Sequence, residues 1–382
     1  MEVYRAPIHQ NEIIIGQEVD KRPRTRCGYL VPDAYSAYET SLGEVGSTAS
    51  GKALHFAADI ICSGGLDIWI RGAYSYAIQH INLANPRIFV YLKHKIQELD
   101  KKFSVLPQET FFSNPDVHSL IGESVLVLQL CPKRAKITWP KLDDNTKRTG
   151  WLRGVAGSPE TTATRAVWKS DGDTMPMYFV ANELCKAIQE NQSERALFWV
   201  RWLIEEDMRV RKETKGHGLS TKERGPAEAP PRARTEVGHF ICELLVKIYN
   251  ELASKELIRM HEEFQEIIRI FRGKEKRMPV RLKRDCLGLL TLICCEVPKW
   301  KIPAAQTLVK DPIVLSRAVN QSSSFFNEVL ANPSLSADKL MKPGMTKASK
   351  KKVDKEKEKK VVCMEEQFDA YDKAMEAYLN RQ

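Results

Sequence analysis

The sequence predicts a mainly α, multi-helical protein, and two observations carry that prediction. Apolar residues recur at intervals of three and four over much of the chain, as Phe56, Ala57, Ile60 and Ile61 illustrate. Glycine and proline interrupt these runs, because glycine tolerates the left-handed backbone at a helix end and proline lacks the N–H that a helix needs. The pattern divides the chain into two helical blocks with irregular ends.

The first 46 residues are predicted to form an extended arm. Residues 1–46 mix proline, tyrosine, glycine and charge without a clean period, apart from an apolar run at 12–16 that could add a short strand. An extended arm needs a surface to lie on, and a neighbouring subunit would provide one.

Residues 47–213 are predicted to form the first helical block. Three helices are expected across 53–99, because the glycine pair at 64–65 and the Asn85-Pro86 step each end a run of helical spacing. Almost all of this stretch carries an apolar helical face. It therefore predicts a packed building block.

Two further parts of this block are informative. Residues 125–130 (VLVLQL) fit a strand by their β-branched content and a buried helix by their setting, and periodicity alone does not separate the two. The setting among helices favours a helix. Residues 177–189 and 193–212 carry apolar faces on either side of a short polar turn, which predicts a helical hairpin.

The stretch 214–235 (TKGHGLSTKERGPAEAPPRART) is predicted to link the two blocks. It is polar, interrupted by glycine, proline and charge, and has no apolar period. The second block covers 236–331, with helices expected at 237–253, 257–271, 282–296 and 312–330. The helix at 282–296 is apolar on most faces and is expected to lie at the centre of this block.

The C-terminal region is predicted to be a flexible Lys-rich segment (332–362) followed by a terminal helix (363–382). Amphipathic spacing in that helix makes it a candidate docking element for a partner. The residues expected to contact the partner are Phe368, Tyr371, Met375 and Tyr378.

Composition places the chain among globular proteins of the cytosol or nucleus. The 382 residues are 43% hydrophobic, and no run approaches the roughly 18 uncharged apolar residues that a membrane-spanning helix needs. The N-terminus has no basic-then-apolar signal pattern. Nine scattered cysteines, without a CxxC pair, favour buried reduced thiols over a disulfide framework.

The net charge of +10 is unevenly distributed. Residues 339–360 hold ten lysines against Asp354, Glu356 and Glu358. Outside this tail, two basic runs are candidate contacts for an anionic partner, because basic side chains release counterions from phosphate and aromatic rings can stack on bases. The candidate residues are Lys133, Arg134, Lys136, Trp139, Trp151, Arg277, Arg281, Lys283 and Arg284.

No motif predicts catalysis, and no cofactor, metal or small-molecule substrate is expected. Residues 46–53 (GSTASGKA) match the GxxxxGK phosphate-binding loop, but Ala53 stands where a hydroxyl residue would hold magnesium. No buried strand leads into the motif either. A glycine- and serine-rich helix start is the favoured interpretation, and a degenerate nucleotide-binding protein is the alternative.

Three stretches resemble a known family. They are Phe56–Leu92 (FAADIICSGGLDIWIRGAYSYAIQHINLANPRIFVYL), Glu123–Leu142 (ESVLVLQLCPKRAKITWPKL) and Ala181–Asp207 (ANELCKAIQENQSERALFWVRWLIEED). The chain resembles a conserved, mostly helical protein of unassigned activity in nucleocytoplasmic large DNA viruses, the group that includes the iridoviruses, marseilleviruses and chlorella viruses. The resemblance implies a helical fold and a viral setting, and it carries no catalytic signature.

Together these observations predict a non-enzymatic viral structural protein, a minor capsid or scaffold component. It would act through contacts with other virion or capsid proteins, in the virion and in the host cytoplasm during assembly. The alternative is a basic nucleic-acid-binding accessory factor in viral transcription, replication or genome packaging. A steep loss of DNA affinity with salt would favour the alternative.

Overall fold

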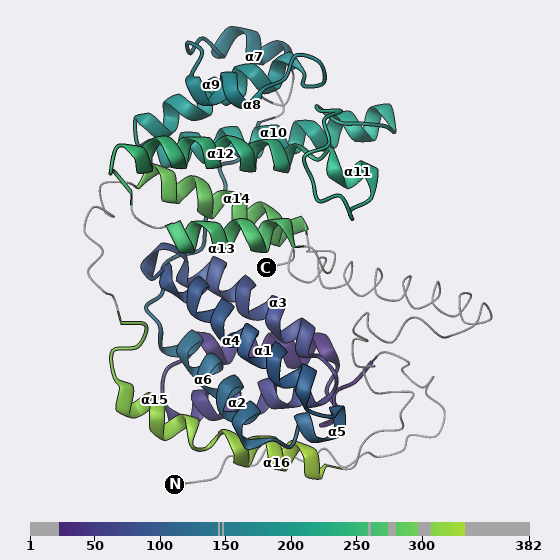
Figure 1. Cartoon of the computed structure of the whole chain (residues 1–382), viewed down its shortest axis with the longest axis vertical. Helices are drawn as coiled ribbons and strands as arrows, with labels where there is room; N and C mark the ends of the chain where they lie inside the picture. Colours follow the sequence, from purple (N-terminus) through teal and green to yellow (C-terminus); the bar gives the residue numbers. More distant parts are fainter. Residues whose placement is uncertain are drawn as a thin grey trace, which may run out of the picture. The chain divides into compact units, whose positions relative to one another are not determined.

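The computed structural model describes residues 23–143, 146, 149–258, 261–273, 280–296 and 307–332. These residues form a mainly α protein, as predicted (Figure 1). Within the described part, extended pairing is limited to two isolated bridges, Arg24 with Leu30 and Asp173 with Ser220.

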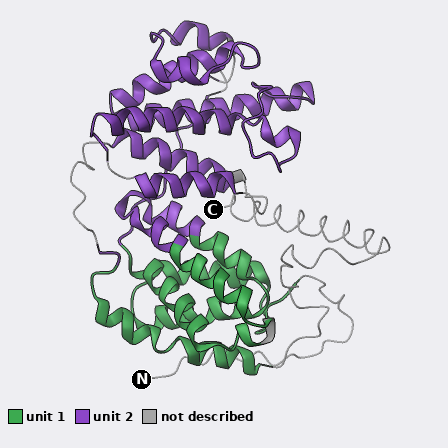
Figure 2. Cartoon of the chain, in the orientation of Figure 1, with its two compact units in different colours: residues 1–73, 94–131, 309–382 green, residues 74–93, 132–308 purple. Residues whose placement is uncertain are grey.

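The chain divides into two compact units, each built from segments that are far apart in the sequence (Figure 2). Unit 1 takes residues 1–73, 94–131 and 309–382, and unit 2 takes residues 74–93 and 132–308. The division falls within two helices, α3 (Leu66–Tyr76) and α4 (Arg87–Val105).

Unit 1 is a bundle whose helices approach closely at small residues. Its other helices are α1 (Val31–Gly43), α2 (Ser47–Cys62), α5 (Gln108–Phe111), α6 (Pro115–Leu130), α15 (Pro312–Val319) and α16 (Ser322–Ala331). Helix α2 packs against α1, α6 and α16. A Cβ atom at Gly72 would overlap the Tyr35 ring, and one at Gly122 would overlap Ser322, so glycine sets the spacing at both places.

The prediction of an extended arm over residues 1–46 is wrong for its last third. Residues 31–43 form α1, which begins at Val31 with Pro32 in its first turn and buries Tyr35, Tyr38 and Leu42. The mixed composition of this stretch made its apolar helical face hard to recognise, although unit 1 buries that face. Pro32 is tolerated because the backbone N–H groups of a helix's first turn have no partner within the helix. Residues 1–22 lie outside the described residues.

Unit 2 is organised around α14 (Val280–Cys295). This helix contacts α9 (Met175–Gln189), α10 (Ser193–Thr214), α12 (Val237–Ser254) and α13 (His261–Arg272). It buries Leu287, Leu289, Leu290 and Ile293, which bears out its predicted central position. The unit also contains three short helices, α7 (Thr149–Val155), α8 (Thr162–Val167) and α11 (Pro231–Arg234).

The predicted boundary between two consecutive blocks is also wrong. Residues 214–235 lie within unit 2, and α10 contacts α12 across this stretch, whereas α15 and α16 pack with α2 and α6 in unit 1. The stretch is packed through backbone pairing: Thr174 N donates to Leu219 O at 3.1 Å and Thr221 N to Gly172 O at 2.9 Å. A polar stretch without an apolar period can be fixed when its own backbone groups are satisfied in this way.

Two local predictions are confirmed. Residues 125–130 are helical within α6, where Val125, Leu126 and Leu128 are fully buried. The hairpin is formed by α9 and α10, and Asn191 makes the turn between them with a φ of 56°. Asparagine is among the few residues other than glycine that adopt this left-handed backbone readily.

The C-terminal predictions lie outside the described residues. The Lys-rich segment 332–362 is described only at Asn332, and the terminal helix 363–382 is not described. The candidate docking residues Phe368, Tyr371, Met375 and Tyr378 therefore stay predictions.

Candidate anionic-partner surface

The surface begins at a break in helical geometry between α3 and α4. Residues Ala77–Ile81 form a π-helical turn (η1), and a short 3₁₀ turn (η2, Asn82–Ala84) follows. Asn82 has a φ of 37°, and its side chain donates to Ala135 O at 3.2 Å and accepts from Leu83 N at 2.6 Å. Single π-helical turns are frequent at functional sites, and this one fixes a neighbouring segment of chain.

That segment, residues 132–143, runs along α14 and is held at both ends. Arg134 N donates to His80 O at 2.8 Å, and the Arg134 guanidinium makes a two-pronged ion pair with Glu296 at 2.8 and 3.0 Å. At the other end, Trp139 Nε1 donates to Asp285 Oδ1 at 3.3 Å, and Pro140 O accepts from Arg201 at 2.8 Å. The segment therefore lies antiparallel to α14.

The middle of the segment depends on Gly288. A Cβ atom at this position would lie 2.8 Å from the Trp139 ring and 3.5 Å from Ile137, so only glycine lets the indole approach α14 this closely. The guanidinium of Arg284, also on α14, lies over the Trp139 ring, with its carbon 5.5 Å from the centroid. Trp139 is thus half-buried in a fixed position against α14, in contact with an arginine of the same helix.

Positive charge gathers along this segment. Lys133, Arg134 and Lys136 come from the segment, and Arg281 and Arg284 come from α14; the carboxylates among them are Asp285 and Glu296. Burial, together with Lys136 and Lys133, lowers the pKa of His80 to about 4, so His80 is neutral at pH 7. Burial likewise raises the pKa of Asp285, although the two arginines counteract part of this effect.

The structure separates other predicted residues from this surface. Lys283 belongs to α14 but pairs at 3.3 Å with Glu236, which directly precedes α12. Trp151 lies on α7, where its ring contacts Phe198 and Trp199 of α10 at centroid distances of 6.0 Å. It is part of the hydrophobic packing between α7 and α10. Arg277 lies outside the described residues.

The GxxxxGK motif does not form a phosphate-binding loop. Residues from Ser47 onward belong to α2, and Gly46 precedes the helix with a φ of 112°. Lys52 points to Glu44, with 3.8 Å between the charged atoms, and Ser50 donates to Gln129 at 2.8 Å. The motif is a helix start, as the favoured interpretation predicts.

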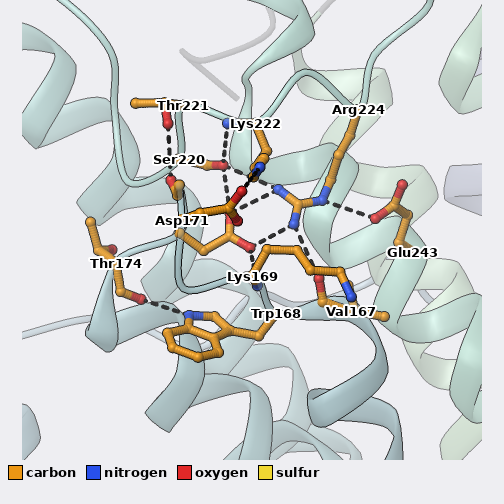
Figure 3. Close-up of polar contacts among 12 residues, drawn as sticks. Val167, Trp168, Lys169, Asp171, Thr174, Ser220, Thr221, Lys222, Arg224 and Glu243 are labelled. Carbon is orange, nitrogen blue, oxygen red and sulfur yellow. Dashed lines mark hydrogen bonds and ion pairs between the residues drawn. The ribbon is translucent and has the colours of Figure 1, made fainter.

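The sequence missed a second polar feature of unit 2, a cleft of about 560 Å³. Figure 3 shows the polar contacts of several residues that line it, among them Lys169, Lys222 and Arg224. It is lined by five cationic side chains and three carboxylates, together with apolar residues. The charged residues are Lys169, Lys222, Arg224, Lys247, Arg272, Asp171, Glu223 and Glu243. They come from the connection after α8, the stretch predicted as a linker, α12 and α13, so no motif in the sequence brings them together.

Neither metal ligation nor membrane insertion is indicated by the residues that the structure describes. Among them, no three His, Cys, Asp or Glu side chains gather closely enough to hold a metal ion. No helix in the described ranges combines the length and apolar character needed to cross a membrane. Comparison of the chain with protein-family models, with curated proteins and with solved structures found no match.

Proposed function

We propose that this chain is a non-enzymatic binding protein that holds the phosphate backbone of a nucleic acid against the surface formed by residues 132–143 and α14. The observation that carries the proposal is the convergence of six predicted contact residues, from two distant parts of the sequence, on one surface of unit 2. These residues are Lys133, Arg134, Lys136, Trp139, Arg281 and Arg284.

The fixed backbone of the segment favours binding. Arg134 and Trp139 are both held by α14, and the π-helical turn fixes the start of the segment through Arg134 N and Asn82. Lys133 and Lys136 are exposed beside these anchors. A lysine on a fixed segment contacts phosphate as a point charge, and little backbone entropy is lost when it binds.

Charge favours a polyanion over a neutral partner. Among the described residues, five cations lie on this surface with the carboxylates of Asp285 and Glu296, and His80 is neutral at pH 7. Displacing condensed counterions from a nucleic acid supplies sequence-independent affinity, which this arrangement can use. The minor capsid or scaffold function predicted from the sequence stays a prediction, and an acidic protein surface is the competing partner for these cations.

Salt-dependent binding tests the proposal. The anisotropy of labelled single- and double-stranded DNA would be measured against the full chain at several salt concentrations. Removing one cation that neutralises a phosphate should reduce the slope of log K against log salt by about 0.9 for double-stranded DNA and about 0.7 for single-stranded DNA. The double variant Lys133→Gln/Lys136→Gln is therefore expected to reduce the slope by about 1.8 and about 1.4, respectively, and to weaken the binding of both probes.

Lys283→Gln is the matched control, because Lys283 lies on α14 beside Arg284 but pairs with Glu236. It is expected to leave the slope unchanged. Equal slopes for the wild type and the double variant would overturn the proposal. So would DNA binding that is insensitive to salt.

A further inference from the structure

We propose that the cleft lined by Lys169, Arg224, Lys247 and Arg272 binds a small phosphate ester, independently of the nucleic-acid surface. The inference goes beyond the proposed function and also beyond the expectation from sequence that no small molecule binds. It rests on three features of the cleft, namely a rigid wall, uncompensated cations and a suitable volume.

The wall is fixed by Arg224, whose guanidinium is fully engaged (Figure 3). It donates to both oxygens of buried Asp173 at 2.8 and 2.6 Å, to Glu243 at 2.9 Å and to Val167 O at 3.1 Å. Ser220 Oγ also donates to Asp173 at 2.6 Å. This network joins the connection after α8, the 219–224 stretch and α12, so the cleft does not need to be assembled when a ligand binds.

The carboxylates that line the cleft are already compensated. Asp171 forms an ion pair with Lys222, and Glu223 forms one with Arg234 at 2.8 Å. Glu243 pairs with Arg224 at 2.9 Å. Each of these carboxylates therefore has a basic partner of its own. Lys222, and to a smaller extent Lys169, lower the pKa of Asp171.

Three lining cations form no ion pair with a carboxylate within the described ranges. Lys169 donates to the carbonyl oxygen of Ala166 at 2.9 Å. Lys247 and Arg272 are exposed on α12 and α13, and the Arg272 side chain also hydrogen-bonds Cys242. Because they come from three different elements and line one cleft, their charges converge on any ligand inside it. Three cations around one space suit an anion with more than one negative charge, such as a phosphate monoester.

The volume and the remaining polar groups define the ligand class. A cleft of about 560 Å³ lies within the range typical of small-molecule sites. The carboxylates of Glu243 and Asp171 can accept hydrogen bonds from hydroxyl groups of a ligand. A dianionic phosphate group has no hydroxyl group, so these donors would have to come from the organic part of the ester. The geometry therefore points to a phosphate ester whose organic part carries hydroxyl groups, such as a sugar phosphate.

Calorimetric titration of the full chain tests this inference, with ribose 5-phosphate, inorganic phosphate and ribose as probes. Ribose 5-phosphate is expected to bind more tightly than inorganic phosphate, and ribose is expected not to bind. Lys247→Gln and Arg272→Gln should each raise the dissociation constant about tenfold, the change expected when one charged hydrogen bond is removed. Lys212→Gln, which removes an exposed lysine of α10 outside the cleft, is the control and should bind as the wild type does.

A second measurement uses the unaltered protein. Lys169 and Lys247 should be protected from acetylation by ribose 5-phosphate, while Lys212 should not be protected. The Lys133→Gln/Lys136→Gln variant should bind ribose 5-phosphate normally, which separates this inference from the nucleic-acid proposal. Absence of binding by the wild type, or equal binding by the wild type and both cleft variants, would overturn it.

Discussion

Two buried aspartates have the same structural role in the two units, but only one of them forms an ion pair with an arginine. In unit 1, Asp59 of α2 holds the turn at residues 24–30 by accepting from Cys27 N at 3.0 Å. In unit 2, Asp207 of α10 holds the 214–235 stretch by accepting from Leu219 N at 2.7 Å. Asp207 also pairs with Arg211 at 2.7 Å, whereas Asp59 has no arginine partner among its hydrogen bonds.

The two units fix their irregular segments at different electrostatic cost. Burial raises the pKa of Asp59, because hydrogen bonds from Thr25 and Cys27 and the nearby His55 offset only part of the desolvation. Asp207 has a counter-charge that Asp59 lacks, the guanidinium of Arg211, which also donates a hydrogen bond to Thr235 O at 2.7 Å. One ion pair therefore fixes the 214–235 stretch at two points, Leu219 and Thr235. A Cβ atom at Gly218 would overlap Asp207 Oδ1, so the segment also needs glycine there.

The largest expected loss of stability follows from breaking the ion pair between Asp207 and Arg211 in unit 2. Asp207→Ala leaves the Arg211 guanidinium, 8% exposed, without its carboxylate and removes the acceptor for Leu219 N. Removing one partner of a buried ion pair costs about 3–5 kcal/mol of unfolding free energy. Urea unfolding followed by tryptophan fluorescence would measure this loss.

The control for Asp207→Ala is Glu213→Ala on the same helix. Glu213 is 58% exposed and pairs with Arg209 at 2.7 Å, so its loss should cost less than about 1 kcal/mol. Similar losses for the two variants would show that burial of the Asp207 pair does not matter.

A smaller effect is expected where packing, and not charge, holds a segment. Gly288→Ala places a methyl group 2.8 Å from the Trp139 ring and should cost about 1–3 kcal/mol by overpacking. It should also shift the tryptophan emission and weaken DNA binding, because residues 132–143 lose their place on α14. The measurements are urea unfolding and an anisotropy titration with labelled DNA.

Gly154→Ala provides the matched control for that substitution. Gly154 lies in α7 with no atom within 4 Å of an added Cβ, so alanine should stabilise the helix by about 0.5–1 kcal/mol. A Gly288→Ala variant as stable as the wild type would mean that Trp139 is not fixed by its contact with α14.

The smallest expected effect is a gain in stability, and it follows from replacing Asp59. Because burial raises its pKa in the folded protein, Asp59 favours folding at low pH, and this contribution is lost as the pH rises through the raised pKa. Asp59→Asn stays neutral and can still accept from Cys27 N. The variant should therefore melt at a higher temperature than the wild type at pH 7, and the difference should shrink as the pH falls toward 4.

Thermal melts between pH 4 and pH 8 would test this expectation. Asp33→Asn, at an exposed position in the first turn of α1, is the control and should change the melting temperature little at any pH. A melting difference for Asp59→Asn that does not change with pH would contradict the assigned role of burial.

Several features followed from the sequence because they depend on neighbours along the chain. Helical spacing predicted the hairpin of α9 and α10 and the central helix α14, and the setting of residues 125–130 predicted α6. Composition also predicted buried cysteines, and seven of the eight cysteines in the described part are buried. Burial raises the pKa of Cys62 and of Cys242 to about 12, so these thiols stay protonated at pH 7.

Only the tertiary structure decided which segments belong together. The division into units places α15 and α16 with α2 and α6, although about 180 residues separate α6 from α15, and an apolar face does not specify which other face it meets. The predicted boundary at 214–235 was wrong because Asp207, Arg211 and Gly218 fix a stretch that has no apolar period of its own.

The two candidate sites also differ in how much of each could be predicted from the sequence. Charge and aromatic composition were enough to single out Lys133, Lys136 and Trp139, but only the fold placed them beside α14. The fold also packs Trp151 against Phe198 and pairs Lys283 with Glu236. The cleft around Arg224 has no sequence signature, because its lining comes from four separate segments. Local periodicity determines helices, whereas long-range polar contacts between residues of ordinary type determine where irregular segments and charged sites lie.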